Sequence, residues 1–319
     1  RARTGTKQCP ELTLHPDQSV GAGQKTVSRV TPLTVAFIEK LESFISSYDV
    51  LFCDIWGVLH NGVKAYAAAS AALKQFREQG GTVILVSNAP RPGLDVVPLL
   101  DKFGVDRLAY DGIVTSGDVT HTMLKASSWS RYYWIGPQRD RELFRGLTQQ
   151  ATKIEDADVV VCTGLIDDTR EKAEDYRAIC EAIRKRDLPF LCANPDIVVE
   201  RGSEIIDCAG AIAEIYKEIG GEVIYAGKPY KPVYDAALDV ASSLNRKLPD
   251  LKRTLMIGDA IRTDVAGARN LGCASLFVMR GIHMHELGLH RGALEDGSFE
   301  NFIKTASHKP DYAIDMLSW

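Results

Sequence analysis

Four short polar segments of the 319-residue chain carry residue types that suit chemistry on a phosphate group. The hydroxyl of Ser87 and the backbone N–H groups after it could receive phosphate oxygens, and Lys228 could add positive charge. The carboxylates of Asp259 and Asp264 offer the oxygen ligands that Mg²⁺ prefers. Asp54 is a fourth candidate, because it directly follows an apolar run. Each segment alone also suits a helix cap, a turn or a surface charge, but their joint occurrence favours one shared site.

Apolar runs precede three of these segments and indicate strands that are buried on both faces of a sheet. They cover residues 50–53, 82–86 and 254–257. Amphipathic stretches at 65–79 and 231–244 predict helices. This alternation predicts an α/β fold with a doubly wound, mostly parallel, Rossmann-like sheet. Because ligands bind beyond the carboxyl ends of parallel strands, we expect the three polar segments to meet there.

The middle of the chain has strands and helices of its own. Apolar runs at 132–135, 158–162 and 189–192 predict strands, and the pattern at 171–185 predicts a helix. The section 129–222 is therefore expected to form a second α/β domain inserted into the first. Residues 1–30 form a polar arm without a hydrophobic period. Since the chain begins with Arg1, this arm could be a tag remnant, a processed terminus or a cropped start.

Composition and charge are typical of a globular protein and exclude several other classes. Hydrophobic residues make up 45% of the chain and charged residues 25%, as in ordinary globular proteins. The net charge of -4 without a long basic run argues against nucleic-acid binding and against a polybasic membrane patch. No apolar run is long enough for membrane insertion. Seven cysteines without a C-x-x-C pair indicate free thiols in a reducing compartment, either the cytoplasm or an organelle matrix.

In this order, the four segments resemble the motifs of the haloacid dehalogenase (HAD) superfamily of phosphotransferases. Those motifs are a strand-end Asp, a Ser or Thr, a Lys, and Gly-Asp-x-x-x-x-Asp. More narrowly, the chain is similar to the class IIA branch, which includes 4-nitrophenylphosphatases, pyridoxal phosphatases and phosphoglycolate phosphatases. The segments that carry this resemblance are Gly57-Val58-Leu59, Ser87-Asn88, Val114-Thr115-Ser116-Gly117, Ala193-Asn194-Pro195-Asp196 and Gly227-Lys228-Pro229. The first motif, with Trp56 two residues after Asp54, resembles that of a less characterised subgroup.

The resemblance implies a hydrolase core at 31–128 and 223–319, with residues 129–222 as an α/β cap over the site. It implies that Asp54 attacks phosphorus and forms an aspartyl-phosphate. Ser87 and the backbone of Asn88 would bind the transferring phosphoryl group, and Lys228 would neutralise charge on that group and on Asp54. These roles suit phosphoryl transfer, which needs mainly positioning and electrostatic stabilisation.

The cofactor that the resemblance implies is Mg²⁺. Its expected ligands are Asp54, Asp259 and the backbone carbonyl of Trp56, with Asp264 as a supporting carboxylate. The cap is expected to select the substrate, a small phosphorylated metabolite, and its candidate contacts are Asn194 and Asp196. An Asn-Pro turn with an Asp cap is the alternative interpretation of this segment. A homodimer or incorporation in a larger assembly is a further expectation by analogy with the branch.

The chain departs from the family pattern at Trp56. Most phosphatases of the superfamily carry there a second Asp, which acts as acid toward the leaving group and as base toward water. The indole of Trp56 exchanges no proton near neutral pH. Three explanations are open: His60 supplies the proton, the substrate is an acyl phosphate that needs none, or the protein is slow or inactive. The leading hypothesis is a Mg²⁺-dependent phosphatase, and the alternative is a catalytically weak or inactive relative that serves as a structural subunit or ligand-binding module.

Overall fold

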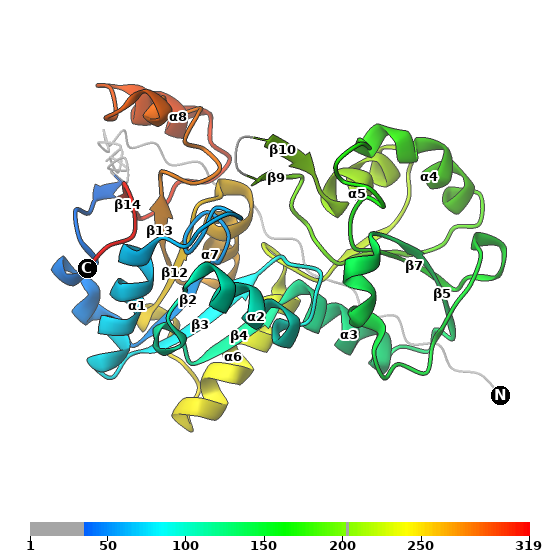
Figure 1. Cartoon of the computed structure of the whole chain (residues 1–319), viewed down its shortest axis with the longest axis horizontal. Coiled ribbons are helices and arrows are strands. Elements are labelled where there is room, and N and C mark those ends of the chain that lie inside the picture. Colours follow the sequence, from blue (N-terminus) through cyan, green and yellow to red (C-terminus); the bar gives the residue numbers. More distant parts are fainter. Residues whose placement is uncertain (1–34, 202–203) are drawn as a thin grey trace, which may run out of the picture. The chain divides into compact units, whose positions relative to one another are not determined.

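The computed structural model of the protein describes residues 35–201 and 204–319 (Figure 1). In this part of the chain the strands form two parallel sheets and one antiparallel hairpin. The polar arm expected at residues 1–30 lies outside it, as does Cys9. The six cysteines in the described part are all free thiols. None of the helices found there has the length and apolar character needed to cross a bilayer.

The larger sheet has seven strands among the described residues, in the order β1-β14-β13-β12-β2-β3-β4, and every pairing is parallel. Its strands are β1 (Ala36–Phe37), β2 (Val50–Cys53), β3 (Thr82–Ser87), β4 (Gly112–Thr115), β12 (Thr254–Gly258), β13 (Ala274–Val278) and β14 (Tyr312–Ile314). The strands expected at 50–53, 82–86 and 254–257 are β2, β3 and β12, which are neighbours in the sheet. Apart from the edge strand β1, the chain order runs outward from β2 in both directions, so the sheet is doubly wound, as predicted.

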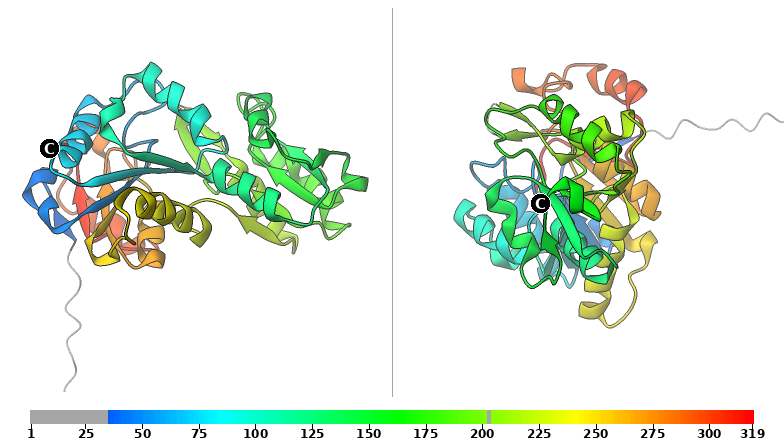
Figure 2. Two further views of the ribbon diagram at one scale, coloured as in Figure 1. Left: turned by 90° about the horizontal axis from the view of Figure 1, so that it is seen from below. Right: turned by 90° about the vertical axis from the view of Figure 1, so that its right-hand side faces the viewer.

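Helices cover both faces of this sheet (Figure 2). The helices of this part are α1 (Ala67–Glu78), α2 (Gly93–Phe103), α3 (Ser116–Ala126), α6 (Lys231–Asn245), α7 (Ala266–Leu271) and α8 (Ser298–Thr305). Leu51 and Leu85 face a hydrophobic cluster with α1 and α2, whereas Phe52 and Ile84 face a cluster with α3, α6 and α7. Successive strand residues are thus buried on opposite faces, which explains the continuous apolar runs in the sequence.

The second sheet is also parallel, with five strands among the described residues in the order β11-β8-β7-β5-β6. Its strands are β5 (Arg131–Ile135), β6 (Gln150–Ala151), β7 (Val159–Cys162), β8 (Phe190–Cys192) and β11 (Val223–Tyr225). α4 (Arg177–Arg184) and α5 (Ala209–Glu218) cover one face. Leu124, near the end of α3, packs on the other face, so this helix contacts both sheets. The helix expected at 171–185 is split into a 3-10 turn, Ala173–Tyr176, and α4.

One strand of the second sheet lies beyond the section expected to form it. β11 follows residue 222, yet it pairs with β8, with Tyr225 opposite Cys192. The chain therefore leaves the second sheet after Tyr225, three residues later than the sequence pattern suggested. The half-buried run Val223–Tyr225 is too short to reveal this from periodicity. As a consequence, Lys228 follows the carboxyl end of a strand of the second sheet.

A short antiparallel hairpin follows β8 in the chain. It consists of β9 (Val198–Arg201) and β10 (Glu204–Asp207), and α5 follows it. The hairpin lies between the two sheets (Figure 1). Its position matters because β9 contacts the loop that follows β2, as described below.

Candidate active site

Asp54, Ser87 and Asp259 come together at the carboxyl ends of three neighbouring strands. Asp54 directly follows β2, Asp259 directly follows β12, and Ser87 is the last residue of β3. β2 pairs in parallel with both neighbours, and the Asp54 backbone N–H donates to the Ile257 carbonyl at 2.8 Å. All three side chains line one cavity. The polar segments that were predicted at strand ends therefore line the same cavity at one edge of the sheet.

Lys228 reaches this place from the second sheet. Its Nζ donates to Asp54 Oδ1 at 2.6 Å and to Asp264 Oδ1 at 2.7 Å, and only 2% of the residue is exposed. Desolvation lowers the pKa of Lys228, but the carboxylates of Asp264 and Asp54 outweigh it and hold the pKa well above its ordinary value. The ammonium group therefore stays charged beside Asp54.

Asp54, Asp259 and Asp264 form a buried cluster, and one carboxylate oxygen of each lies within 4.8 Å of the others. The backbone N–H of Ile282 donates to Asp259 Oδ2 at 2.7 Å, and that of Ala260 donates to Asp264 Oδ2 at 3.1 Å. Burial raises the pKa of Asp54 to about 7, although Lys228 acts in the opposite direction. Burial and the two neighbouring carboxylates raise the pKa of Asp259 well above its usual range.

This cluster fits the magnesium ligands that the sequence suggested. All its donors are carboxylate oxygens, which suit a hard divalent cation. Three buried carboxylates exceed the single positive charge of Lys228, which pairs with two of them, so a divalent cation would offset the remaining negative charge. Asp54, Asp259 and the carbonyl of Trp56 in the adjoining loop are the groups that would hold it, with Asp264 beside them. Trp56 lines the same cavity.

Two glycines allow the chain to pass close to Asp259. A Cβ atom at Gly57 would lie 1.9 Å from Asp259 Oδ2, and one at Gly281 would lie 2.1 Å from the same oxygen. Gly57 also has a φ of +81°, a conformation that side chains disfavour. The loop after β2, at Gly57, and the loop after β13, at Gly281, can therefore lie directly against the carboxylate because these positions lack side chains.

Asn88 connects the phosphate-binding candidate Ser87 to the second sheet. Its side-chain Oδ1 accepts a hydrogen bond of 2.7 Å from the Lys228 backbone N–H, and its Nδ2 donates to Asp196 Oδ1 at 2.8 Å. Asp196 follows β8, and its own N–H donates to Asn194 Oδ1 at 3.1 Å. Asn194 therefore shapes the turn, as in the alternative interpretation, while both residues line the cavity.

The surroundings of His60 do not favour the proton-donating role considered from the sequence. The ring is 2% exposed instead of lying in an open loop, and it packs against Trp56 and Phe103. Its Nδ1 accepts a hydrogen bond of 3.0 Å from the Gly62 N–H. Burial lowers the pKa of His60 to about 4. A lowered pKa does not favour the protonated imidazole that an acid needs. His60 nevertheless lines the cavity, so its part as the substitute acid stays a prediction from the sequence.

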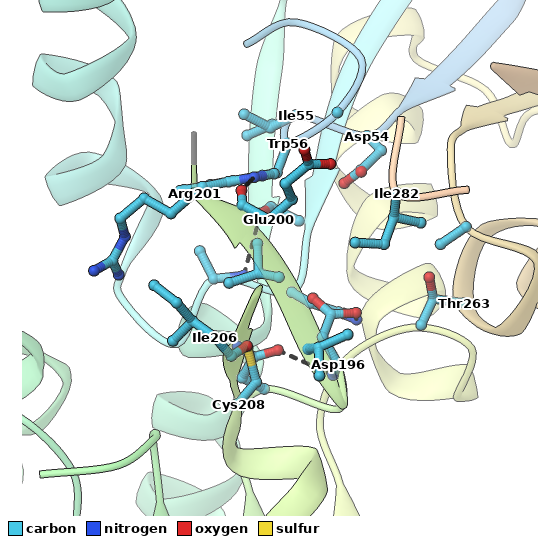
Figure 3. A pocket seen from close by; sticks show the side chains of 18 of the residues that line it. Asp54, Ile55, Trp56, Asp196, Glu200, Arg201, Ile206, Cys208, Thr263 and Ile282 are labelled. Carbon is cyan, nitrogen blue, oxygen red and sulfur yellow. Dashed lines mark hydrogen bonds between the residues drawn. The ribbon is translucent and has the colours of Figure 1, made fainter. Parts of the chain in front are cut away.

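Trp56 is committed to a contact with the hairpin. Its indole Nε1 donates to the backbone carbonyl oxygen of Glu200, in β9, at 2.7 Å (Figure 3). The ring also lies over Gly62, where a Cβ atom would come within 2.5 Å of Cζ2. The residue that replaces the family's usual Asp therefore links the loop after β2 to the second part of the molecule.

The cavity of about 330 Å³ is lined by both parts of the chain, a size typical of small-molecule sites. Sequence reasoning missed several residues of its wall: Arg91, Asp140, Asp168 and Arg201. Arg91 Nε lies 3.6 Å from Asp140 Oδ1, and Asp168 pairs with Arg139 and Arg201. Arg91 follows the Ser87-Asn88 segment closely enough to have been noticed. Asp140 and Asp168 carry no comparable signal, because isolated charges in loops are common.

Comparison with known proteins identifies the family. Residues 51–149 match the family described as haloacid dehalogenase-like hydrolase, and residues 225–318 match the HAD-hydrolase-like family. The crystal structure of a haloacid dehalogenase-like hydrolase from Brucella suis is 41% identical, with a TM-score of 0.78, and the match covers 88% of this chain and 100% of that one.

Two curated relatives point to the same group. 5'-Nucleotidase YutF from Bacillus subtilis is 24% identical over 278 residues, which cover 86% of this chain and 98% of the relative. Ribonucleotide monophosphatase NagD from Escherichia coli is 26% identical over 236 residues, which cover 73% and 88%. Both are members of the class IIA branch whose motifs the sequence resembles, so that expectation is confirmed. The chain belongs to the haloacid dehalogenase-like hydrolases.

Proposed function

We propose that the protein is a Mg²⁺-dependent phosphatase that hydrolyses a small phosphorylated metabolite through an aspartyl-phosphate on Asp54. One observation carries the proposal: the Asp54 carboxylate lies in the cavity 2.6 Å from Lys228 Nζ, within a cluster of three buried carboxylates. The curated relatives are named for hydrolysis of phosphate monoesters, which supports this substrate class.

Each residue of the cluster has a distinct task in the proposed reaction. Asp54 attacks phosphorus with one carboxylate oxygen, and the bond from phosphorus to the ester oxygen breaks. Ser87 Oγ and the backbone N–H of Asn88 bind equatorial oxygens of the phosphoryl group. Lys228 offsets the negative charge that Asp54 and the phosphoryl group bring together. Asp264 holds the Lys228 ammonium in place through its 2.7 Å contact.

The proposed reaction also needs positive charge from a bound cation. When bound, Mg²⁺ would favour the ionised form of Asp54 and reduce the repulsion between the carboxylates and the phosphate. The raised pKa values of Asp54 and Asp259 support this need, because without added positive charge the buried cluster disfavours ionisation.

The second sheet and the β9-β10 hairpin act as a cap in this proposal, and the core comprises the larger sheet and its helices. The cap contributes Asn194, Asp196 and Glu200 to the walls of the cavity. Enclosure between two layers limits the substrate to a small molecule. The burial of Asp54, Lys228 and Asp259 strengthens the electrostatic interactions between them.

One observation favours the alternative, a weak or inactive relative that binds a ligand or supports an assembly. Trp56 occupies the acid/base position, and its N–H is engaged by Glu200 instead of facing a leaving group. The alternative predicts that the protein binds Mg²⁺ and phosphate without turning over phosphate esters.

The test is release of inorganic phosphate from acetyl phosphate, 4-nitrophenyl phosphate and a panel of phosphorylated metabolites, with and without Mg²⁺. Asp54→Asn should abolish turnover, while Asp49→Asn, at the other end of the same strand and paired with Arg253, should keep it. Equal activity of wild type and Asp54→Asn would contradict the proposal. A folded wild type that binds Mg²⁺ but releases no phosphate from any substrate would favour the alternative.

A further inference from the structure

The proposed reaction lacks a proton donor at its usual place. A phosphate ester with an alkyl leaving group departs as an alkoxide unless it receives a proton. Trp56 cannot supply one, and its N–H is already donated to Glu200 O. His60 also lines the cavity, but burial lowers its pKa to about 4 and its Nδ1 accepts a hydrogen bond from the Gly62 N–H. A substitute has to lie in the cavity close to the phosphate-binding residues.

We propose that Asp196, at the end of a cap strand, protonates the leaving group and afterwards accepts a proton from the attacking water. This role rests on the phosphatase function proposed above and deepens it. It assigns the acid/base group to the cap, whereas the usual Asp of the superfamily stands two residues after the nucleophile in the core.

Asn88, which directly follows the proposed phosphate-binding residue Ser87, holds the Asp196 side chain in position. Asn88 Nδ2 donates to Asp196 Oδ1 at 2.8 Å, and Asn88 directly follows Ser87. No hydrogen bond to Asp196 Oδ2 is found within residues 35–201 and 204–319, so this oxygen is available to carry a proton. Asp196 lines the same pocket as Asp54 (Figure 3).

The burial of Asp196 favours its protonated form. Burial raises its pKa, against the positive charge of Lys228 and the hydrogen bond from Asn88. The carboxylate of Asp264 also raises it. Asp196 in turn acts to raise the pKa of Asp54, and both residues line one cavity. Acid catalysis of this reaction requires Asp196 protonated and Asp54 ionised, and the raised pKa of Asp196 favours the first of these conditions.

Asp196 gives up one proton and regains one in the course of the proposed reaction. Asp54 forms a bond to phosphorus while the bond from phosphorus to the ester oxygen breaks, and that oxygen takes the proton of Asp196 to leave as an alcohol. The Asp196 carboxylate then accepts a proton from water as the water oxygen bonds to phosphorus. The bond from phosphorus to Asp54 breaks, which releases inorganic phosphate and restores both carboxyl groups.

Asp140 is the rival candidate in the same cavity. It is 2% exposed, and burial raises its pKa to about 6. However, its carboxylate lies 3.6 Å from Arg91 Nε, which stabilises the ionised form, and it has no contact with Ser87 or Asn88 among the described residues. Asp140 therefore provides a matched comparison, because it is a buried cap carboxyl group without the link to the phosphate-binding segment.

The experiment measures kcat/KM for a series of aryl and alkyl phosphates with increasing leaving-group pKa, in the presence of Mg²⁺. For Asp196→Asn, which can still accept the hydrogen bond from Asn88, kcat/KM should fall about 10²- to 10⁴-fold with alkyl phosphates. With 4-nitrophenyl phosphate it should change little, since that leaving group needs no proton. Rates of Asp196→Asn should thus depend more steeply on leaving-group pKa, whereas Asp140→Asn should keep the wild-type slope.

Three results would overturn the role of Asp196: an equal loss with every leaving group, which indicates positioning alone; unchanged kinetics; or a steeper slope in Asp140→Asn instead. Asp196→Ser, which keeps a hydroxyl acceptor for Asn88, replaces Asp196→Asn if the latter does not fold. Failure of the phosphatase function itself is distinguishable, because the wild type would then show no turnover that depends on Asp54.

Discussion

The indole N–H of Trp56 donates a hydrogen bond of 2.7 Å to the backbone carbonyl oxygen of Glu200, 144 residues away in the chain. Trp56 belongs to the loop after β2. Glu200 belongs to strand β9 of the hairpin, which follows strand β8 in the chain. The bond therefore joins the loop after β2 to the hairpin, and both of its residues line the cavity. A position that usually serves proton transfer in this superfamily here serves the attachment of the hairpin.

Trp56→Phe should loosen the β9-β10 hairpin. The phenyl ring keeps an aromatic contact with His60, but Glu200 loses its donor, and a hydrogen bond of this kind contributes about 1 kcal/mol. Backbone amides at 198–201 and 204–207 should then exchange roughly fivefold faster. Hydrogen–deuterium exchange followed by mass spectrometry measures this directly.

Trp134→Phe is the control for that experiment. Trp134 Nε1 donates to Thr163 Oγ1 at 3.1 Å within the second sheet, so its replacement also removes an indole hydrogen bond. It should leave exchange in the hairpin unchanged. Equal protection of the hairpin in wild type and Trp56→Phe would show that the Trp56 hydrogen bond does not hold β9 in place.

Lys228→Met should destabilise the folded protein strongly. Removing one partner of a buried ion pair leaves uncompensated charge, at a cost of about 3–5 kcal/mol, and Lys228 faces both Asp54 and Asp264. Urea unfolding at pH 7.5 without added Mg²⁺ measures the free energy of unfolding. Part of the loss should be recovered at lower pH, because the two carboxylates can then take up protons.

Lys231→Met is the matched control for Lys228→Met. The Lys231 side chain is 81% exposed and pairs with Asp235 on the surface of α6. Exposed pairs of this type contribute less than about 1 kcal/mol. A Lys228→Met variant as stable as Lys231→Met would mean that the buried lysine does not balance the acidic cluster.

Much of the fold could be predicted from the sequence because both sheets are parallel. Strands buried on two faces leave continuous apolar runs, and β2, β3 and β12 begin where those runs begin. Their carboxyl ends lie at one edge, so Asp54, Ser87 and Asp259 could be placed together without knowing the side-chain geometry. The prediction depended on local patterns and on a general rule of topology.

The contacts between the two parts of the chain could not be predicted in this way. Asn88 meets Asp196 across 108 residues, and neither residue lies in a periodic segment that would reveal the meeting. Lys228 arrives from a strand of only three residues, Val223–Tyr225. The burial of His60 arises from Phe103, which lies on α2 and is distant in the sequence. Such contacts follow from how the layers pack, and short polar turns carry little information about packing.

Asp259→Asn should have opposite effects on stability without and with Mg²⁺. Without the cation, burial and the neighbouring carboxylates disfavour ionisation of Asp259, so removing its charge should leave stability unchanged or increased. With Mg²⁺ at about 100 times its dissociation constant, the wild type should gain about 2.7 kcal/mol, and the variant should lose most of this gain. Urea unfolding in chelator and in Mg²⁺ tests both parts.

Asp168→Asn serves as the control for the magnesium effect. Asp168 lines the cavity but pairs with Arg139 and Arg201 outside the acidic cluster. Its variant should keep the stabilisation by Mg²⁺, whatever its own stability. If Asp259→Asn kept the full stabilisation as well, the proposed ligand set would be incorrect.

His60 should make the folded protein sensitive to mild acid. Burial lowers its pKa from 6.5 to about 4, so the unfolded chain takes up a proton at higher pH than the folded one. The stabilising contribution is complete above pH 6.5 and is lost as the pH falls through 4, and it amounts to about 3 kcal/mol at most. In His60→Asn, which can still accept the hydrogen bond from Gly62, the free energy of unfolding should depend less on pH between 6.5 and 4. His285→Asn, at an exposed position, should retain the wild-type dependence, and equal slopes in all three proteins would show that His60 is not the group that titrates.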